Sequence, residues 1–204
     1  MALVVFDDRV REILDFSTPQ SKIAERIGHV GAAGPKDRTA IYDSILYALQ
    51  LLERPSTADS IYIVTDGADT ASHTKFSDIA LRVSSTGVRL YVSLLFPELG
   101  NRSREPWEYI GPENLTNLAG MTGGESNSPY PPPGFLKKPE DTDQIAQETH
   151  KFFLRMEQNY RLNLELSAPM RKTSKWDLRL SEEGRQRWGN AQLNYPRELA
   201  ACQP

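Results

Sequence analysis

Two short segments carry the side chains best placed for binding chemistry. Residues 37–44 read Asp-Arg-Thr-Ala-Ile-Tyr-Asp-Ser and bring Thr39 to the start of an apolar helical pattern. Residues 65–67 read Thr-Asp-Gly and follow a run of β-branched and aromatic residues. Taken alone, Thr39 or Asp37 could cap the helix, and Asp66 could be the turn residue of an Asp-Gly pair. The elements around these residues must decide between such roles and a binding site.

Other kinds of reactive site find little support. The three histidines have no partner at metal-ligand spacing and are expected to be surface or helix-end residues: His29, His73 and His150. The serines lack the Gly-x-Ser-x-Gly turn of a hydrolase nucleophile, and Thr122-Gly-Gly lacks the Lys-Ser/Thr pair of a phosphate-binding loop. Asp69 is expected to be a loop or capping residue rather than a ligand.

Strands and helices alternate along the chain, which predicts an α/β fold with a mainly parallel sheet flanked by helices. Apolar segments at 2–6 and 10–14, joined by a short polar link, predict an antiparallel opening hairpin. The continuously apolar run at 61–64 predicts a parallel strand covered on both faces. Further patterns predict helices over 21–30, 39–55, 76–87 and 115–120, and a strand over 88–96.

The remainder of the chain divides into a helix and a tail. A Pro-rich stretch at 129–133 is expected to be a surface loop. Asp141 or Asp143 can cap a last long helix, whose buried stripe is expected to hold Ile145, Thr149, Phe152, Phe153, Met156 and Tyr160. Apolar and polar residues then alternate at 162–166 and 176–180, which predicts a β addition. We therefore predict an α/β domain at 1–159 and a β-rich C-terminal extension at 160–204.

The composition excludes several function classes. The 204 residues are 39% hydrophobic and 25% charged, which is ordinary for a globular protein with one sizeable core. The formal net charge is −3 and no basic stripe is interleaved with aromatic residues, so we expect no nucleic-acid partner. No apolar run approaches the roughly 18 residues that span a bilayer, so we expect no membrane span.

The two polar segments together resemble the von Willebrand factor A domain. Residues 61–69 are similar to the family's fourth strand, which ends in Thr-Asp-Gly, and residues 37–44 are similar to its threonine loop. Further segments resemble family elements: the opening hairpin its second and third strands, 88–96 its fifth strand, and 118–124 its late Gly-Gly turn. The likeness covers residues 1 to about 159, and Tyr160-Arg-Leu and Tyr195-Pro-Arg resemble the extension of a bacterial subgroup.

This resemblance implies a metal-ion-dependent adhesion site at the carboxyl ends of the parallel strands. In the family, an Asp-x-Ser-x-Ser loop, a threonine matching Thr39 and an aspartate matching Asp66 surround one divalent cation, Mg²⁺ or Mn²⁺. Such a hard ion prefers hydroxyl, carboxylate and water oxygens. An acidic side chain of a protein partner completes the shell. The resemblance therefore implies a non-enzymatic protein-binding module.

The sequence departs from the family in one respect. No Asp-x-Ser-x-Ser precedes Thr39, and Met1 falls at the start of the family's second strand. We expect the first strand and its serine loop to belong to a longer protein, and this chain to bind metal weakly or not at all. Without that strand two sheet edges are expected to lie unpaired, which favours dimerisation through them. Export or association with the cell envelope is expected if a signal peptide lies upstream.

Two other functions stay open on the sequence alone. A Mg²⁺-dependent phosphoryl-transfer enzyme on a similar sheet would use Asp66 or Asp69. Such enzymes usually present a second carboxylate after another strand, whereas Asp7-Asp8 falls in a hairpin link. A structural domain that binds no metal would leave Thr39 as a cap and Asp66 as a turn residue.

Overall fold

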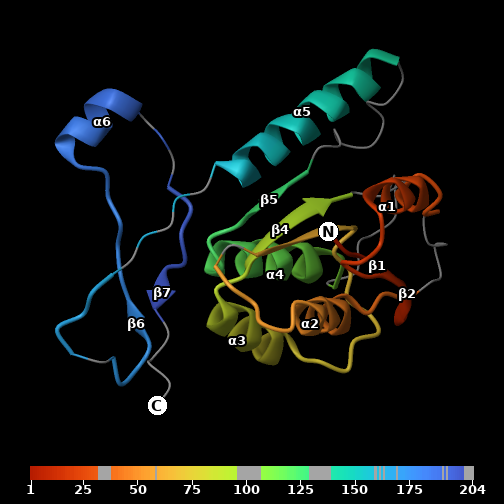
Figure 1. Ribbon diagram of the computed structural model, residues 1–204, viewed down its shortest axis with the longest axis horizontal. Helices are drawn as coiled ribbons and strands as arrows, with labels where there is room; N and C mark the ends of the chain where they lie inside the picture. The colour runs from red at the N-terminus through yellow and green to blue at the C-terminus, as the bar shows by residue number, and fades with distance from the viewer. Residues whose placement is uncertain are drawn as a thin grey trace.

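The computed structural model describes residues 1–31, 38–57, 59–95, 107–128, 139–158, 160, 162, 164–168, 170–189, 191 and 193–199. The predictions for Asp37, Phe96 and the Pro-rich stretch at 129–133 fall outside these ranges. The described chain is a mixed α/β structure in which helices flank a parallel three-stranded sheet (Figure 1). Within the same ranges, no helix combines the length and the apolar character needed to cross a bilayer.

The chain opens with the predicted hairpin. β1 (Leu3–Phe6) pairs antiparallel with β2 (Val10–Leu14). α1 (Gln20–Ile27) follows and buries a single side chain completely, that of Ile23. The helix predicted over 21–30 is therefore present but shorter, since its C-terminal apolar residues remain at the surface.

Three parallel strands form the central sheet. β3 (Ser60–Thr65) pairs with β4 (Arg89–Leu94), and β4 pairs with β5 (Glu125–Asn127). The parallel strands predicted from the apolar runs are confirmed. β5 escaped prediction because Glu125-Ser-Asn lacks the apolar and β-branched residues that mark a strand.

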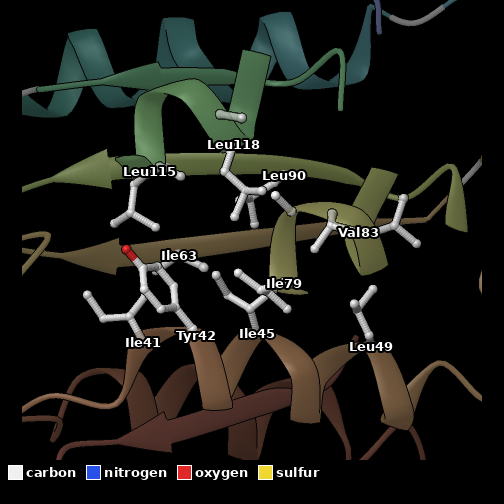
Figure 2. Close-up of a cluster of buried hydrophobic side chains, with 14 of the residues drawn as sticks. Ile41, Tyr42, Ile45, Leu49, Ile63, Ile79, Val83, Leu90, Leu115 and Leu118 are labelled. Atoms are coloured by element: carbon white, nitrogen blue, oxygen red, sulfur yellow. The ribbon is translucent and has the colours of Figure 1, made fainter. Parts of the chain in front are cut away.

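The main hydrophobic core lies between the sheet and three helices: α2 (Ile41–Leu51), α3 (Phe76–Thr86) and α4 (Trp107–Met121). Figure 2 shows the side chains that meet there. The most deeply buried include Ile41, Ile45, Ile79, Val83, Leu90, Val92, Leu115 and Leu118. Helical spacing on the helices and alternation along the strands bring these side chains into one layer.

α4 is longer than the helix predicted over 115–120. It begins at Trp107 and contains Pro112 in its interior. Gly111 and Pro112 discourage a helix in the sequence. In the fold they contact Gly67 in the loop after β3, where a side chain on Gly67 would collide with the Pro112 ring. The long helix therefore brings its N-terminal half to the end of β3.

α5 (Pro139–Glu157) packs on the other face of the sheet. The ring of the fully buried Phe152 lies 6.1 Å from the ring of Tyr62 and 6.0 Å from that of Tyr91. Tyr62 and Tyr91 face α5 because side chains alternate between the two faces of a strand. Arg155 fixes the helix further, since its guanidinium binds both carboxylate oxygens of Glu125 on β5.

Two details of the predicted last helix are wrong. Asp141 and Asp143 lie within α5 instead of capping it, because the helix already begins at Pro139, a residue whose fixed φ suits a first turn. Phe153 and Tyr160 were expected in the buried stripe but are 40% and 84% exposed. The helix ends at Glu157, so Tyr160 lies beyond it.

β3 lies at one side of its sheet. The hairpin β1–β2 forms a separate two-stranded sheet, so no strand in the described ranges pairs with the outer side of β3. Val64 on β3 is 48% exposed. The prediction of a strand covered on both faces is therefore wrong for Val64, which lies on the same face of β3 as Tyr62 but is left uncovered there.

The C-terminal part contains a helix that the sequence pattern does not predict. β6 (Ser174–Lys175) pairs with β7 (Glu198–Leu199), and α6 (Glu182–Trp188) lies between them in the chain, on the side of Figure 1 away from α1. Residues 162, 164 and 166 are leucines that are half exposed and lie outside any strand, so the predicted β addition is wrong there. Alternation forms a strand only where a partner strand is within reach.

Candidate functional site

The carboxyl end of β3 meets the segment that leads into α2. The chain leaves β3 at Thr65 and runs through residues 66–75 before α3 begins, and this stretch lies beside residues 38–43. Both candidate residues from the sequence, Thr39 and Asp66, belong to this pair of segments. We call residues 66–75 the β3 loop and residues 38–40 the α2 approach.

The backbone of Thr39 binds the β3 loop through both its carbonyl oxygen and its nitrogen. Its carbonyl oxygen accepts hydrogen bonds from the nitrogens of Thr70 at 2.8 Å and Ala71 at 3.0 Å. Its own nitrogen donates to the Thr70 hydroxyl at 2.9 Å. Arg38 adds two bonds from its guanidinium to the Thr70 carbonyl, at 3.1 and 2.8 Å. The α2 approach is thereby held along the β3 loop.

The cap of α2 comes from Asp69 rather than from Thr39. The residue at the N-cap position is Ala40, whose side chain cannot accept a hydrogen bond. The Asp69 carboxylate accepts from the nitrogens of Ile41 at 2.7 Å and Tyr42 at 3.4 Å. The interpretation of Asp69 as a capping residue is confirmed, and the alternative reading of Thr39 as the cap is wrong.

Asp43 makes a second connection from the first turn of α2. Its carboxylate accepts from the nitrogens of His73 and Thr74, each at 2.9 Å, and lies 3.3 Å from His73 Nδ1. Burial opposes ionisation of this carboxylate, but the hydrogen bonds from Thr74 and His73 outweigh it and lower the pKa of Asp43 to about 2. Asp43 is therefore ionised at neutral pH, and its hydrogen bonds hold the end of the β3 loop against the first turn of α2.

Asp66 stands at the exposed surface of this arrangement. Its carboxylate accepts a hydrogen bond from the Ala68 nitrogen at 3.1 Å, which closes a local turn. Gly67 follows with φ of 89°, a conformation that favours glycine. Asp66 thus combines the turn role considered from the sequence with an oxygen that faces solvent.

Thr39 and Asp66 are brought onto neighbouring segments without bonding each other. Among the described residues, the Thr39 hydroxyl makes no hydrogen bond, and none joins it to the Asp66 carboxylate. Both oxygens are thus available to a third group. Within the described ranges, however, no three His, Cys, Asp or Glu side chains are grouped as a metal would require.

The turn of the opening hairpin lies against the same place. The carbonyl oxygen of Asp7 accepts a hydrogen bond from the Ala40 nitrogen at 2.6 Å. The Asp7 and Asp8 carboxylates are occupied by the Arg11 guanidinium at 2.5 Å each. Tyr42 joins α4 to the site, since Asn114 on α4 donates a hydrogen bond to the Tyr42 hydroxyl at 3.2 Å. Burial raises the pKa of Tyr42.

Sequence reasoning missed the residues that build this site. Asp43, Thr70 and Ser72 make bonds between segments about 30 residues apart, a separation at which no periodicity carries a signal. The histidines lie at the surface as expected: His29 binds the Glu25 carbonyl, His73 contacts Asp43, and His150 lies on α5.

Comparison with known proteins assigns the chain to no family. No family model matches the chain, and no curated protein matches it. The chain is similar to a solved structure described as an uncharacterized membrane spanning protein from Vibrio fischeri. The two are 19% identical over 74% of each chain, with a TM-score of 0.31, and at that score the likeness carries no argument about fold or function.

Proposed function

We propose that this chain is a non-enzymatic protein-binding module of the von Willebrand factor A type, with Thr39 and Asp66 as two oxygen ligands of an Mg²⁺ or Mn²⁺ site. The observation that carries the proposal is the pairing of the α2 approach with the β3 loop. It presents a hydroxyl that makes no hydrogen bond to the described residues, and an exposed carboxylate at the carboxyl end of a parallel strand. Open α/β sheets bind ligands at that end.

The partner we propose presents an acidic side chain. The first turn of α2 and the β3 loop beside it carry the carboxylates of Asp43, Asp66 and Asp69. An acidic group from a partner would be repelled by these charges unless a divalent cation lies between them. Partner binding should therefore require the ion, and a chelator should abolish it.

The surrounding contacts favour binding over phosphoryl transfer. A phosphoryl-transfer enzyme would need a second free carboxylate near Asp66. Oδ1 of Asp69 is occupied by the N-terminus of α2, and Oδ1 of Asp7 by Arg11. A structural domain that binds no metal is the alternative outcome of the test.

The test is a calorimetric titration with Mn²⁺ of the chain and three variants. Asp66→Ala and Thr39→Ala should lower Mn²⁺ affinity, whereas Asp143→Ala, which removes an exposed aspartate of α5, should not. Two protein oxygens leave most of the six positions around the ion to water, so we expect affinity in roughly the millimolar range for the chain.

A second arm measures binding of a glutamate-containing peptide immobilised on a sensor surface. It should depend on Mn²⁺ and be lost in Asp66→Ala. Equal Mn²⁺ affinity in all four proteins, together with peptide binding indifferent to chelator, would reject the adhesion-site proposal and leave the structural domain.

A further inference from the structure

We propose that Asp69 is a positioning residue of this site: it locks the segment that bears Thr39 to the loop that bears Asp66, so that the two oxygens keep their places before an ion or partner arrives. The inference rests on the proposed function, because it takes Thr39 and Asp66 as the ligands. It assigns Asp69 a role that acts through them.

One oxygen of Asp69 serves two elements at once. It accepts from the Ile41 nitrogen at 2.7 Å at the start of α2, and from the Ser72 hydroxyl at 2.6 Å within the β3 loop. The Ser72 hydroxyl in turn accepts from the Asp43 nitrogen at 3.2 Å. Asp69 and Ser72 therefore form a bridge whose two ends lie on α2.

The bridge is close to both candidate ligands along the chain. Ile41 lies two residues after Thr39, and Asp69 lies three residues after Asp66. An extended residue spans at most about 3.6 Å, so a fixed bond between Ile41 and Asp69 leaves Thr39 and Asp66 only short arms of chain. Ile41 is fully buried in the core, which gives the bridge a rigid base.

The same contacts commit Oδ1 of Asp69 to α2 and to Ser72. The Ile41 and Tyr42 nitrogens belong to the first turn of α2, which has no acceptor within the helix. The partial positive charge of a helix N-terminus stabilises a carboxylate there. An ion that took Oδ1 would leave the nitrogen of the buried Ile41 without an acceptor, which is costly.

Amide hydrogen exchange and Mn²⁺ titration of the same variants test the proposal. Asp69→Ala should raise the exchange rates of the Ile41, Thr70 and Ala71 amides by about tenfold. It should also weaken Mn²⁺ binding by about tenfold, because the free energy of ordering the β3 loop then opposes binding. Asp69→Asn keeps a carbonyl acceptor and should stay close to the parent in both measurements. Asp66→Ala should lose Mn²⁺ binding with unchanged exchange.

Three outcomes would overturn the proposal. One is Asp69→Asn losing Mn²⁺ as completely as Asp66→Ala with unchanged exchange, which would make Asp69 a ligand. Another is Asp69→Ala raising exchange at Ile41 but leaving Thr70 and Ala71 unchanged, which would make it a cap alone. The third is Asp69→Ala raising exchange at all three amides while Mn²⁺ affinity stays unchanged.

Two further readouts keep the test decisive. If Asp69→Ala fails to fold, Ser72→Ala removes one donor of the bridge and should give smaller changes in the same direction. Failure of the parent chain to bind Mn²⁺ would remove the proposed function, and the exchange rates would still decide whether Asp69 joins the two segments.

Discussion

The backbone nitrogen of Thr74 donates a hydrogen bond to the carboxylate of Asp43 at 2.9 Å. This bond joins the end of the β3 loop to the first turn of α2. With the bond from His73, it makes the ionised form of Asp43 a structural component of the fold.

Asp43 should give the protein a distinct acid sensitivity. Its pKa falls from 3.8 to about 2 in the folded chain, so its contribution to stability is complete above the unfolded value and is lost as pH falls toward 2. The contribution is about 2 kcal/mol at most. Urea unfolding at several pH values should show a constant difference between the parent and Asp43→Asn above about pH 5, shrinking toward pH 2. A difference independent of pH would contradict this role.

Gly67 and Gly120 form a matched pair for testing backbone constraints. Gly67→Ala should destabilise the fold by more than about 1 kcal/mol, because its φ is 89° and its Cβ would meet Pro112. Gly120→Ala should stabilise by about 0.5 to 1 kcal/mol, since Gly120 lies inside α4 with open space at its Cβ position. Thermal unfolding of both variants measures the difference. Equal effects would show that the turn after β3 is not constrained.

The tail should separate from the sheet region under limited proteolysis. Residues 164–168 lie outside any helix or strand and are exposed, so we expect the first cuts there or in 170–174. α2 should resist cleavage, because most of its inward side chains are buried. Mass spectrometry of early fragments checks this. Early cleavage within α2 with an intact tail would contradict the predicted boundary near residue 160.

The last residues of the tail should limit that separation. Tyr195 is 8% exposed, and Pro196 beside it packs against Gly123 after α4. The Tyr195 hydroxyl donates to Asp177 at 2.7 Å. Tyr195→Ala should therefore speed cleavage in 164–174, whereas Trp188→Ala, which removes an exposed side chain of α6, should not. Equal cleavage rates would show that Tyr195 does not anchor the tail.

The outer side of β3 should promote self-association. It has no partner strand among the described residues, and the exposed Val64 offers apolar surface beside it. Val64→Lys should shift the chain toward monomer, because a charge at a strand edge opposes edge-to-edge pairing. Leu81→Lys is the control, since Leu81 is 74% exposed and lies on α3 rather than on a strand. Analytical ultracentrifugation should separate the two, and identical profiles would refute the idea.

Local patterns in the sequence predicted the elements that have clear periodicity. The hairpin, α2 and the two long parallel strands follow from apolar spacing that is visible within ten residues or so. β5 and α6 escaped because their residues are mostly polar, and their structure depends on what lies beside them. The alternating leucines after residue 160 failed as a strand for the same reason, since no partner strand reaches them.

The sequence by itself determined an α/β protein with Thr39 before a helix and Asp66 at the end of a strand. Only the tertiary structure decided that Asp69 caps α2 and that Asp43 holds Thr74, because these bonds cross 28 and 31 residues of chain. Periodicity reports which face of an element is apolar, whereas a hydrogen bond between distant segments exists only once packing has brought them together.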